Sequence, residues 1–244
     1  MKFNRFSALT LCLTALLGAG AAEASIMRPA SSMVLIQEAA QGGSLNVTNT
    51  SDVDALLYVK IYDLPDDRGP QLLVTQPVTR LAAGETQRVR FLLNTRAALT
   101  HEHLKRVIVE GIPLVPIDAD RVAVNLRQDL PVIIHPAALP MLADPWKMLR
   151  CRTVNGDLRI ENSGRYVVRL AQSITLLPQQ KTVTLDKSYL LPGEVITLAG
   201  QGRSETRQLE IQSLSKYGYV AGKFRLIVSC LLYTSDAADE RSSV

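Results

Sequence analysis

Short β-like runs separated by turn residues are the feature that most constrains how this chain folds. In 86–93, Val89, Phe91 and Leu93 share one face, because side chains alternate along a strand. Such runs recur at a spacing of roughly 8–12 residues, which is typical of antiparallel sandwiches. No long helical period is present, although one helical turn is expected within 94–105. The predicted strands are Ser44–Thr48, Ala55–Tyr62, Leu72–Thr75, Thr79–Leu81, Thr86–Leu93, Arg106–Glu110, Arg121–Ile134, Cys151–Val154, Leu158–Glu161, Tyr166–Leu176, Val195–Ala199, Gln208–Leu214 and Lys223–Ser229.

The two ends of the chain are set apart from this pattern. Residues 1–24 combine a basic start, an apolar run and a small-x-small site at Ala22-Glu23-Ala24, which predicts a cleaved secretory signal. The alternative is a membrane anchor, but the run is at the lower limit of length for spanning a bilayer. Residues 230–244 contain a stretch that resembles a translated adapter from DNA library preparation, and we expect this tail to be non-native.

A proline-rich segment divides the remainder. Pro136 to Pro145 contains three prolines, which favours a linker at 137–145 between a first domain, 25–136, and a second, 146–229. The second part repeats the β pattern and includes Asn155-Gly156, a strong signal for a two-residue hairpin turn. We therefore predict an all-β protein.

The polar residues give little support for an enzyme. No Gly-x-Ser-x-Gly turn and no glycine-rich phosphate loop is present. His101 and His103 would share a face of a strand, but no third ligand follows them, so no metal and no cofactor is expected. Asp66-Asp67 is interpreted as a solvated loop, and His135 as a structural residue beside the linker.

Charge also excludes one class of partner. The 27 Lys and Arg residues against 23 Asp and Glu give a formal net charge of +4, and the charges are interspersed. A nucleic-acid-binding protein usually shows a basic stripe with aromatic residues beside it. We expect no nucleic acid and no small-molecule substrate.

The segment Arg121–Ile134 is much longer than an average strand of about five or six residues. Val122, Val124, Leu126 and Leu130 share one face. An ordinary half-buried strand would direct this face into its own core. The excess length instead favours a strand with residues available to pair with another chain.

Five segments follow one another in a recognisable order: Asn46–Ser51, Leu73–Arg90, Val109–Pro113, Val122–Leu126 and Val132–Pro136. Together they resemble the PapD-like periplasmic chaperones of pilus (fimbrial) assembly, in a divergent or alternative-class branch. The resemblance covers most of the first domain, and the second domain shares only the general pattern.

The resemblance implies two immunoglobulin-like β-sandwich domains at an angle around a cleft. It also implies a periplasmic, non-enzymatic chaperone that donates a β-strand to pilus subunits and delivers them to an outer-membrane usher. Val122, Val124, Leu126 and Leu130 hold the positions of the donated strand. The alternative is a pilus subunit or adhesin, another secreted sandwich protein, which would need a donor strand instead of supplying one.

In this family two basic side chains in the cleft anchor the carboxylate at the subunit's C-terminus, and this sequence departs from that pattern. The corresponding positions fall near Ser32-Met33, within a first strand expected over 28–36, and on Pro131. Proline has neither a charge nor an N–H. The nearest basic candidates are Arg127, which could instead pair with Asp129 or Glu110, and Arg28.

Cys151 is the remaining cysteine once Cys12 and Cys230 are assigned to the two ends. An odd thiol in an oxidising compartment suggests a missing disulfide partner. The other interpretation, a buried strand cysteine that packs as a small hydrophobic residue, is favoured.

Overall fold

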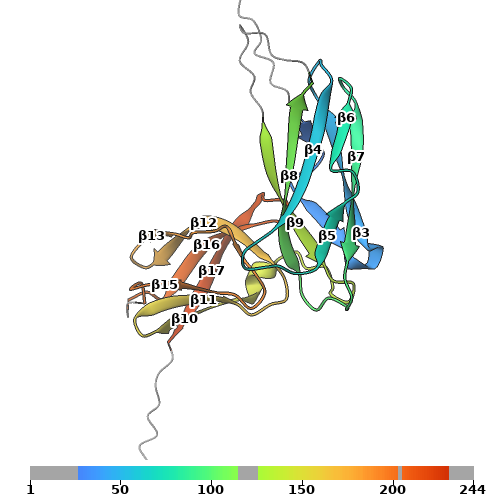
Figure 1. Ribbon diagram of the computed structural model, residues 1–244. Helices are drawn as coiled ribbons and strands as arrows, with labels where there is room; N and C mark the ends of the chain where they lie inside the picture. The colour runs from blue at the N-terminus through green and yellow to red at the C-terminus, as the bar shows by residue number, and fades with distance from the viewer. Residues whose placement is uncertain (1–26, 115–125, 203–204, 231–244) are drawn as a thin grey trace, which may run out of the picture.

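The computed structural model describes residues 27–114, 126–202 and 205–230, and within them it contains two β-sheets. Figure 1 shows the two sheets as two arms that meet at an angle. The only helices among the described residues are short 3-10 turns, η2 (Glu38–Ala40) and η3 (Pro145–Met148). No helix in these ranges is long and apolar enough to cross a membrane. The all-β prediction is therefore confirmed.

The first sheet has the order β5-β7-β3-β2-β9-β8-β4-β6, with β1 paired to β3. Its neighbours are antiparallel except for β2 and β9, which run parallel over Val34–Gln37 and Val132–His135. The sheet curls into a sandwich, because residues of β4, β8 and β9 pack against residues of β2, β3 and β7 in one core. The strands are β1 (Met27–Pro29), β2 (Val34–Gln37), β3 (Gly42–Asn49), β4 (Ala55–Asp63), β5 (Gln71–Val74), β6 (Val78–Leu81), β7 (Thr86–Asn94), β8 (His103–Pro113) and β9 (Arg127–His135).

The second sheet has the order β13-β12-β16-β17-β10-β11-β15, with β14 paired to β12. A parallel pair again joins the two layers, here between β10 and β17. Burial of each large apolar side chain in such a core contributes about 1.5–3 kcal/mol. The strands are β10 (Leu149–Val154), β11 (Asp157–Asn162), β12 (Val168–Leu177), β13 (Lys181–Thr184), β14 (Tyr189–Leu190), β15 (Val195–Leu198), β16 (Gln208–Leu214) and β17 (Val220–Cys230).

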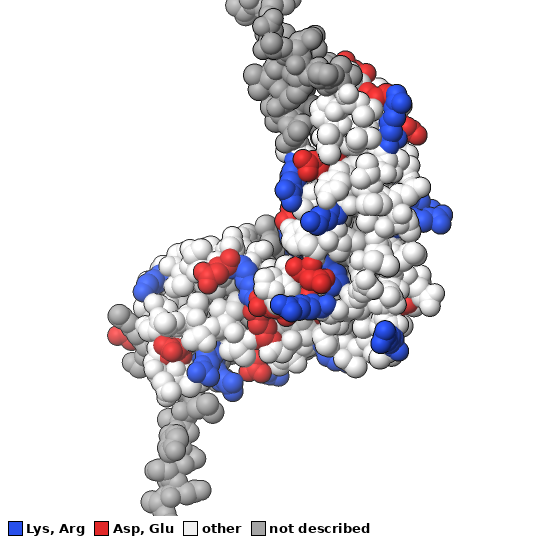
Figure 2. Space-filling model, viewed as in Figure 1, with Lys and Arg blue, Asp and Glu red and all other residues white. Residues whose placement is uncertain are grey.

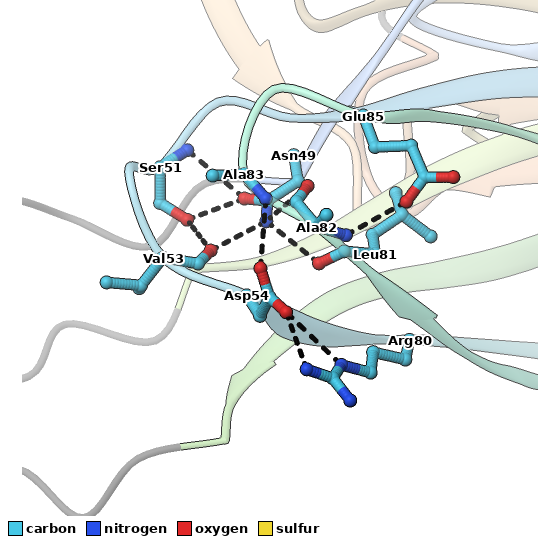
Figure 3. A network of polar contacts seen from close by, with 9 residues as sticks. All are labelled: Asn49, Ser51, Val53, Asp54, Arg80, Leu81, Ala82, Ala83 and Glu85. Atoms are coloured by element: carbon cyan, nitrogen blue, oxygen red, sulfur yellow. Dashed lines mark hydrogen bonds and ion pairs between the residues drawn. The ribbon is translucent and has the colours of Figure 1, made fainter.

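A buried asparagine closes a turn of the first sandwich (Figure 3). The Nδ2 of Asn49 donates to the carbonyls of Val53, Leu81 and Ala82 at 2.9, 3.3 and 3.2 Å. Its Oδ1 accepts from the N–H and the hydroxyl of Ser51. The side chain is 0% exposed, so these bonds satisfy groups that would otherwise be costly to bury.

The second sandwich repeats this arrangement with Asn162. Its Nδ2 donates to the carbonyls of Tyr166, Leu190 and Leu191, and its Oδ1 accepts from the N–H of Gly164. Asn162 is also 0% exposed. Both domains therefore use a buried asparagine to hold a turn, although no fixed-period sequence repeat relates them.

Three expectations from the sequence are wrong. Residues 95–102 contain no helix, because the chain passes from β7 into a loop and then into β8. The first strand is split into β1, which pairs with β3, and β2, which pairs with β9 along its length and with β3 only at Gln37. Asp67 is not solvated: its carboxylate accepts from the N–H of Leu104 and bonds the ring of His103.

Candidate functional site

Strand β9 has an edge that is paired along only part of its length. It pairs with β8 from Arg127 to His135, but with β2 only from Val132 to His135. Residues 127–131 therefore have a strand neighbour on one side alone among the described residues. The side chain of Gln128 bonds the carbonyl of Met27, which is paired to β3 and not to β9. An open edge of this kind can accept a strand from another chain.

The structure places the apolar residues of the predicted donor strand in different environments. Leu126, immediately before β9, is 41% exposed, whereas Leu130 is half-buried and packs on the core of the first sandwich. Val122 and Val124 lie outside the described residues. Two further apolar side chains, Ile112 and Leu114, are exposed where β8 ends, 39% and 40% respectively. Leu126 thus belongs to an exposed apolar group at the ends of β8 and β9, which the sequence patterns did not identify.

The other face of β9 carries charge. Asp129 accepts hydrogen bonds from the Nε of Arg106, at 2.9 Å, and from the hydroxyl of Tyr62, at 2.5 Å. Burial and the Asp129 carboxylate raise the pKa of Tyr62. Arg106 stands directly opposite Pro131 in the β8–β9 register. A basic side chain therefore lies across from the position where the sequence has proline.

The two predicted anchor residues are placed differently. Arg127 is exposed, stands opposite Glu110 and makes no ion pair among the described residues. Asp129, considered as its partner, is bonded to Arg106 instead. Arg28 is exposed on β1, opposite Thr48 of β3, so it belongs to the other layer of the sandwich. The structure does not bring Arg127 and Arg28 together in one contact.

A small apolar cluster joins the two sandwiches. Met33, Leu104 and Ile133 from the first pack with Val167 and Leu191 from the second. Figure 2 shows the surface hollowed on one side of this junction, with blue and red side chains beside the hollow. The junction therefore fixes a cleft between the arms.

Buried polar contacts reinforce the junction. Glu102 is 1% exposed and accepts at 2.8 Å from the ring of His135 and from the N–H of Val167. The second ring nitrogen of His135 faces the carbonyl of Leu139, also at 2.8 Å. At the surface, Lys187 of the second domain also forms an exposed ion pair with Asp66 of the first, at 3.1 Å. His135 is structural, as the sequence indicated.

Arg169, on β12 of the second domain, lies beside this cleft. Its Nη1 donates to the carbonyl of Lys216 at 2.7 Å. Burial and the charge of Arg106 both lower its pKa. Neither Arg169 nor Arg106 was identified from the sequence as a site residue, because strand register and domain packing bring them together.

The two histidines considered as metal ligands contact each other and an aspartate. Their rings lie 4.5 Å apart, and His103 bonds Asp67. Across the three described ranges, no group of three or more potential ligand side chains could hold a metal ion. Cys151 is buried, as the favoured interpretation of that residue predicted.

The two angled sandwiches and the partly unpaired strand β9 define a class of two-domain immunoglobulin-like proteins with an open strand edge in the first domain. The model of the pili and flagellar-assembly chaperone PapD N-terminal domain matches residues 26–140. The chain is also 42% identical over 199 residues to the fimbrial chaperone YhcA of Escherichia coli K12, described as uncharacterized, covering 81% of this chain and 88% of that protein. The chain belongs to the family of pilus-assembly chaperones.

Solved structures agree with this fold. The complex of the Salmonella enterica SafA pilin with the SafB chaperone matches with a TM-score of 0.67 and 20% identity, over 85% of this chain and 98% of that one. The Escherichia coli chaperone DraB matches with a TM-score of 0.64 and 19% identity, over 83% and 98%. These likenesses confirm the architecture of two immunoglobulin-like domains.

Proposed function

We propose that this protein is a periplasmic chaperone that captures pilus subunits by strand donation and delivers them to an outer-membrane usher. The observation that carries the proposal is the open edge of β9 at residues 127–131, with Leu126 exposed beside it. The predicted signal at 1–24 and the family together support a periplasmic location. The solved complex of a pilin with the SafB chaperone is consistent with a pilin as partner.

Strand donation has a clear physical basis. A sandwich that lacks one strand exposes both an unpaired edge and part of its core, and it aggregates if left in that state. A donated strand supplies backbone hydrogen bonds along the edge and alternate apolar side chains for the groove. Each valine or leucine buried in this way contributes about 1.5–3 kcal/mol.

The roles of the individual residues follow from their positions. Val122, Val124 and Leu126 are proposed to enter the subunit's groove. Leu130 already packs against the core of its own domain, so it contributes mainly by holding β9 in place. Arg127 and Arg28 stay as candidate partners for the subunit's terminal carboxylate, and both are exposed enough to reach another chain.

Hydrogen exchange tests the proposal directly. The chaperone is co-expressed with a candidate pilin subunit, and the complex is isolated by size exclusion. Amides of 127–130 that face the open edge should exchange rapidly in the free chaperone and slowly in the complex. Unchanged exchange at these amides in a stable complex would show that the subunit binds elsewhere.

A further inference from the structure

His101 and His103 lie side by side where the loop 95–102 leads into β8, and strand donation uses neither ring. The ring centres are 4.5 Å apart and the ring planes are tilted by 43°. The side chain of Glu102 between them is 1% exposed, whereas both histidines are partly accessible. Because side chains alternate along an extended chain, the two imidazoles face the same side, away from the junction that Glu102 enters.

The ring of His103 is held through one of its nitrogens. Its Nδ1 lies 2.8 Å from the Oδ1 of Asp67. The same carboxylate accepts from the N–H of Gly69 at 3.0 Å and from the N–H of Leu104 at 2.8 Å, so it acts as an acceptor on every side. The Nδ1 of His103 is therefore the donor in this bond, and the lone pair of its Nε2 is available to a ligand.

The loop that carries Asp67 packs closely against this ring. A Cβ at Gly69 would lie 2.5 Å from the Nδ1 of His103 and 2.7 Å from the Oδ1 of Asp67. Only glycine fits so close an approach. The orientation of the His103 ring is thus fixed before any ligand binds, which lowers the entropic cost of binding.

His101 is held in the same way. Its Nδ1 lies 3.0 Å from the hydroxyl oxygen of Thr100, which can accept the Nδ1 proton and leave the lone pair of Nε2 free. Neither Nε2 has a hydrogen-bond partner within the described ranges. The one buried side-chain nitrogen or oxygen that lacks a partner in these ranges is the Nε of Arg159, so both Nε2 atoms are open to solvent.

The spacing of the two rings fits two ligands of one metal ion. A nitrogen–metal bond of about 2.0–2.1 Å puts the ion about 3.2 Å from the centre of its imidazole ring. Two rings at a right angle about the ion then have centres about 4.5 Å apart, and at the tetrahedral angle about 5.2 Å. The observed 4.5 Å favours neighbouring positions of a square-planar or tetragonal site, the geometry of Cu(II) and Ni(II).

The chemistry of the surroundings also fits a metal. Imidazole nitrogens suit copper, nickel and zinc, and among the divalent ions Cu(II) binds such donors most tightly. A carboxylate that accepts the other ring N–H is the usual neighbour of a metal-bound histidine, because it fixes the tautomer and raises the basicity of the ligand. Asp67 holds that position for His103. No third protein ligand joins the two rings in the described parts of the chain, so water completes the coordination.

We propose that His101 and His103 form a binding site for a divalent transition metal, Cu(II) in preference to Zn(II), with the Nε2 of each ring as a ligand and Asp67 as a positioning residue. The ion bridges the end of the loop 95–102 and the first residue of β8. It therefore binds on both sides of Glu102, which accepts from the N–H of Val167 in the second domain. A bound ion stiffens the segment that joins the two sandwiches.

The test titrates the mature chaperone, without an affinity tag, with copper(II) chloride at neutral pH in a buffer that does not coordinate metals. Isothermal titration calorimetry should show one ion bound per chain. The electron paramagnetic resonance spectrum of this complex should show tetragonal Cu(II) with nitrogen ligands. Binding should also raise the Tm, because the ion binds the folded state.

Variants then assign the ligands. Asp67→Asn should weaken copper binding by about 10–100-fold, the usual effect of removing the carboxylate behind a metal-bound histidine. His101→Ala and His103→Ala each remove a ligand, so they should weaken binding further and change the nitrogen pattern of the spectrum. Asp66→Asn, at the neighbouring exposed aspartate, is the matched control and should bind copper as the wild-type protein does.

The variant His101→Ala keeps the test informative if loss of Asp67 unfolds the protein. This ring is hydrogen-bonded only to Thr100 in the described ranges, so its removal should leave the near-ultraviolet circular dichroism unchanged. Unchanged copper affinity in both histidine variants would place the ion elsewhere and overturn the proposal. A wild-type protein that binds no copper overturns it as well, and tighter binding of Zn(II) than of Cu(II) contradicts the preference.

Discussion

The Oε2 of Glu102 accepts a 2.8 Å hydrogen bond from the backbone N–H of Val167, which brings a carboxylate of the first sandwich into the second. The same carboxylate bonds His135 through its other oxygen. Its own backbone N–H donates to the carbonyl of Arg165. One residue therefore connects the end of β9 with the second domain.

Replacing this residue should be costly. Glu102→Ala leaves the N–H of Val167 and the ring of His135 without their buried acceptor. Breaking a buried pair of this kind costs about 3–5 kcal/mol, which urea unfolding would measure. Glu205→Ala, at an exposed position, should change the free energy of unfolding by less than about 0.5 kcal/mol. A loss below about 1 kcal/mol in Glu102→Ala would mean that water replaces the carboxylate.

Introducing a carboxylate into the proposed donor strand tests whether its apolar side chains enter the subunit. Leu126→Asp, alone or with Val124→Asp, should abolish co-purification of the pilin, because a charge cannot enter an apolar groove unpaired. Since Leu126 is 41% exposed, the free energy of unfolding of the single variant should change by less than about 0.5 kcal/mol. Val78→Asp, at a 52% exposed valine of β6, is the matched control and should capture normally. Normal capture by both variants would argue against the donated strand.

Asn49 and Asn162 make equivalent buried hydrogen bonds, so we expect their replacement to destabilise the two domains to a similar extent. Asn49→Ala and Asn162→Ala each leave several buried groups without partners, so each should lower the free energy of unfolding by about 3 kcal/mol or more. Thermal unfolding of the two variants would measure this. Asn46→Ala, an exposed asparagine on β3, is the control. A small effect at Asn162 alone would show that the second turn is closed by other contacts.

The buried thiol of Cys151 predicts how the free energy of unfolding changes with pH. Burial raises the pKa of its thiol to about 12, from about 8.5 in an unfolded chain. The unfolded state thus loses its proton first, so stability is full below about pH 8.5 and falls as pH rises toward 12. Between pH 8 and 10 the wild-type protein should lose about 2 kcal/mol more than Cys151→Ala. Urea unfolding at both pH values, with reductant present, measures the difference, and parallel pH profiles of the two proteins would contradict the shift.

Much of the architecture could be predicted from local patterns. Alternation and turn residues placed most of the strands, including Thr86–Leu93 within β7 and Gln208–Leu214 as β16. The errors have local causes. The segment 95–102 has the composition of a helical turn, but it forms the loop between strands β7 and β8. Asp67 looked solvated because the sequence does not show that β8 passes beside it.

The sequence by itself determined the β-sandwich class, the strand over 127–134 and the absence of a basic residue at Pro131, because alternation and residue identity are local properties. Only the tertiary structure decided that Arg106 faces Pro131, that Glu102 reaches Val167 and that Arg169 lies beside the cleft without an acidic partner in the described residues. These relationships depend on strand register and on the packing of two domains. Both are fixed by burial of apolar surface shared among segments far apart in the chain.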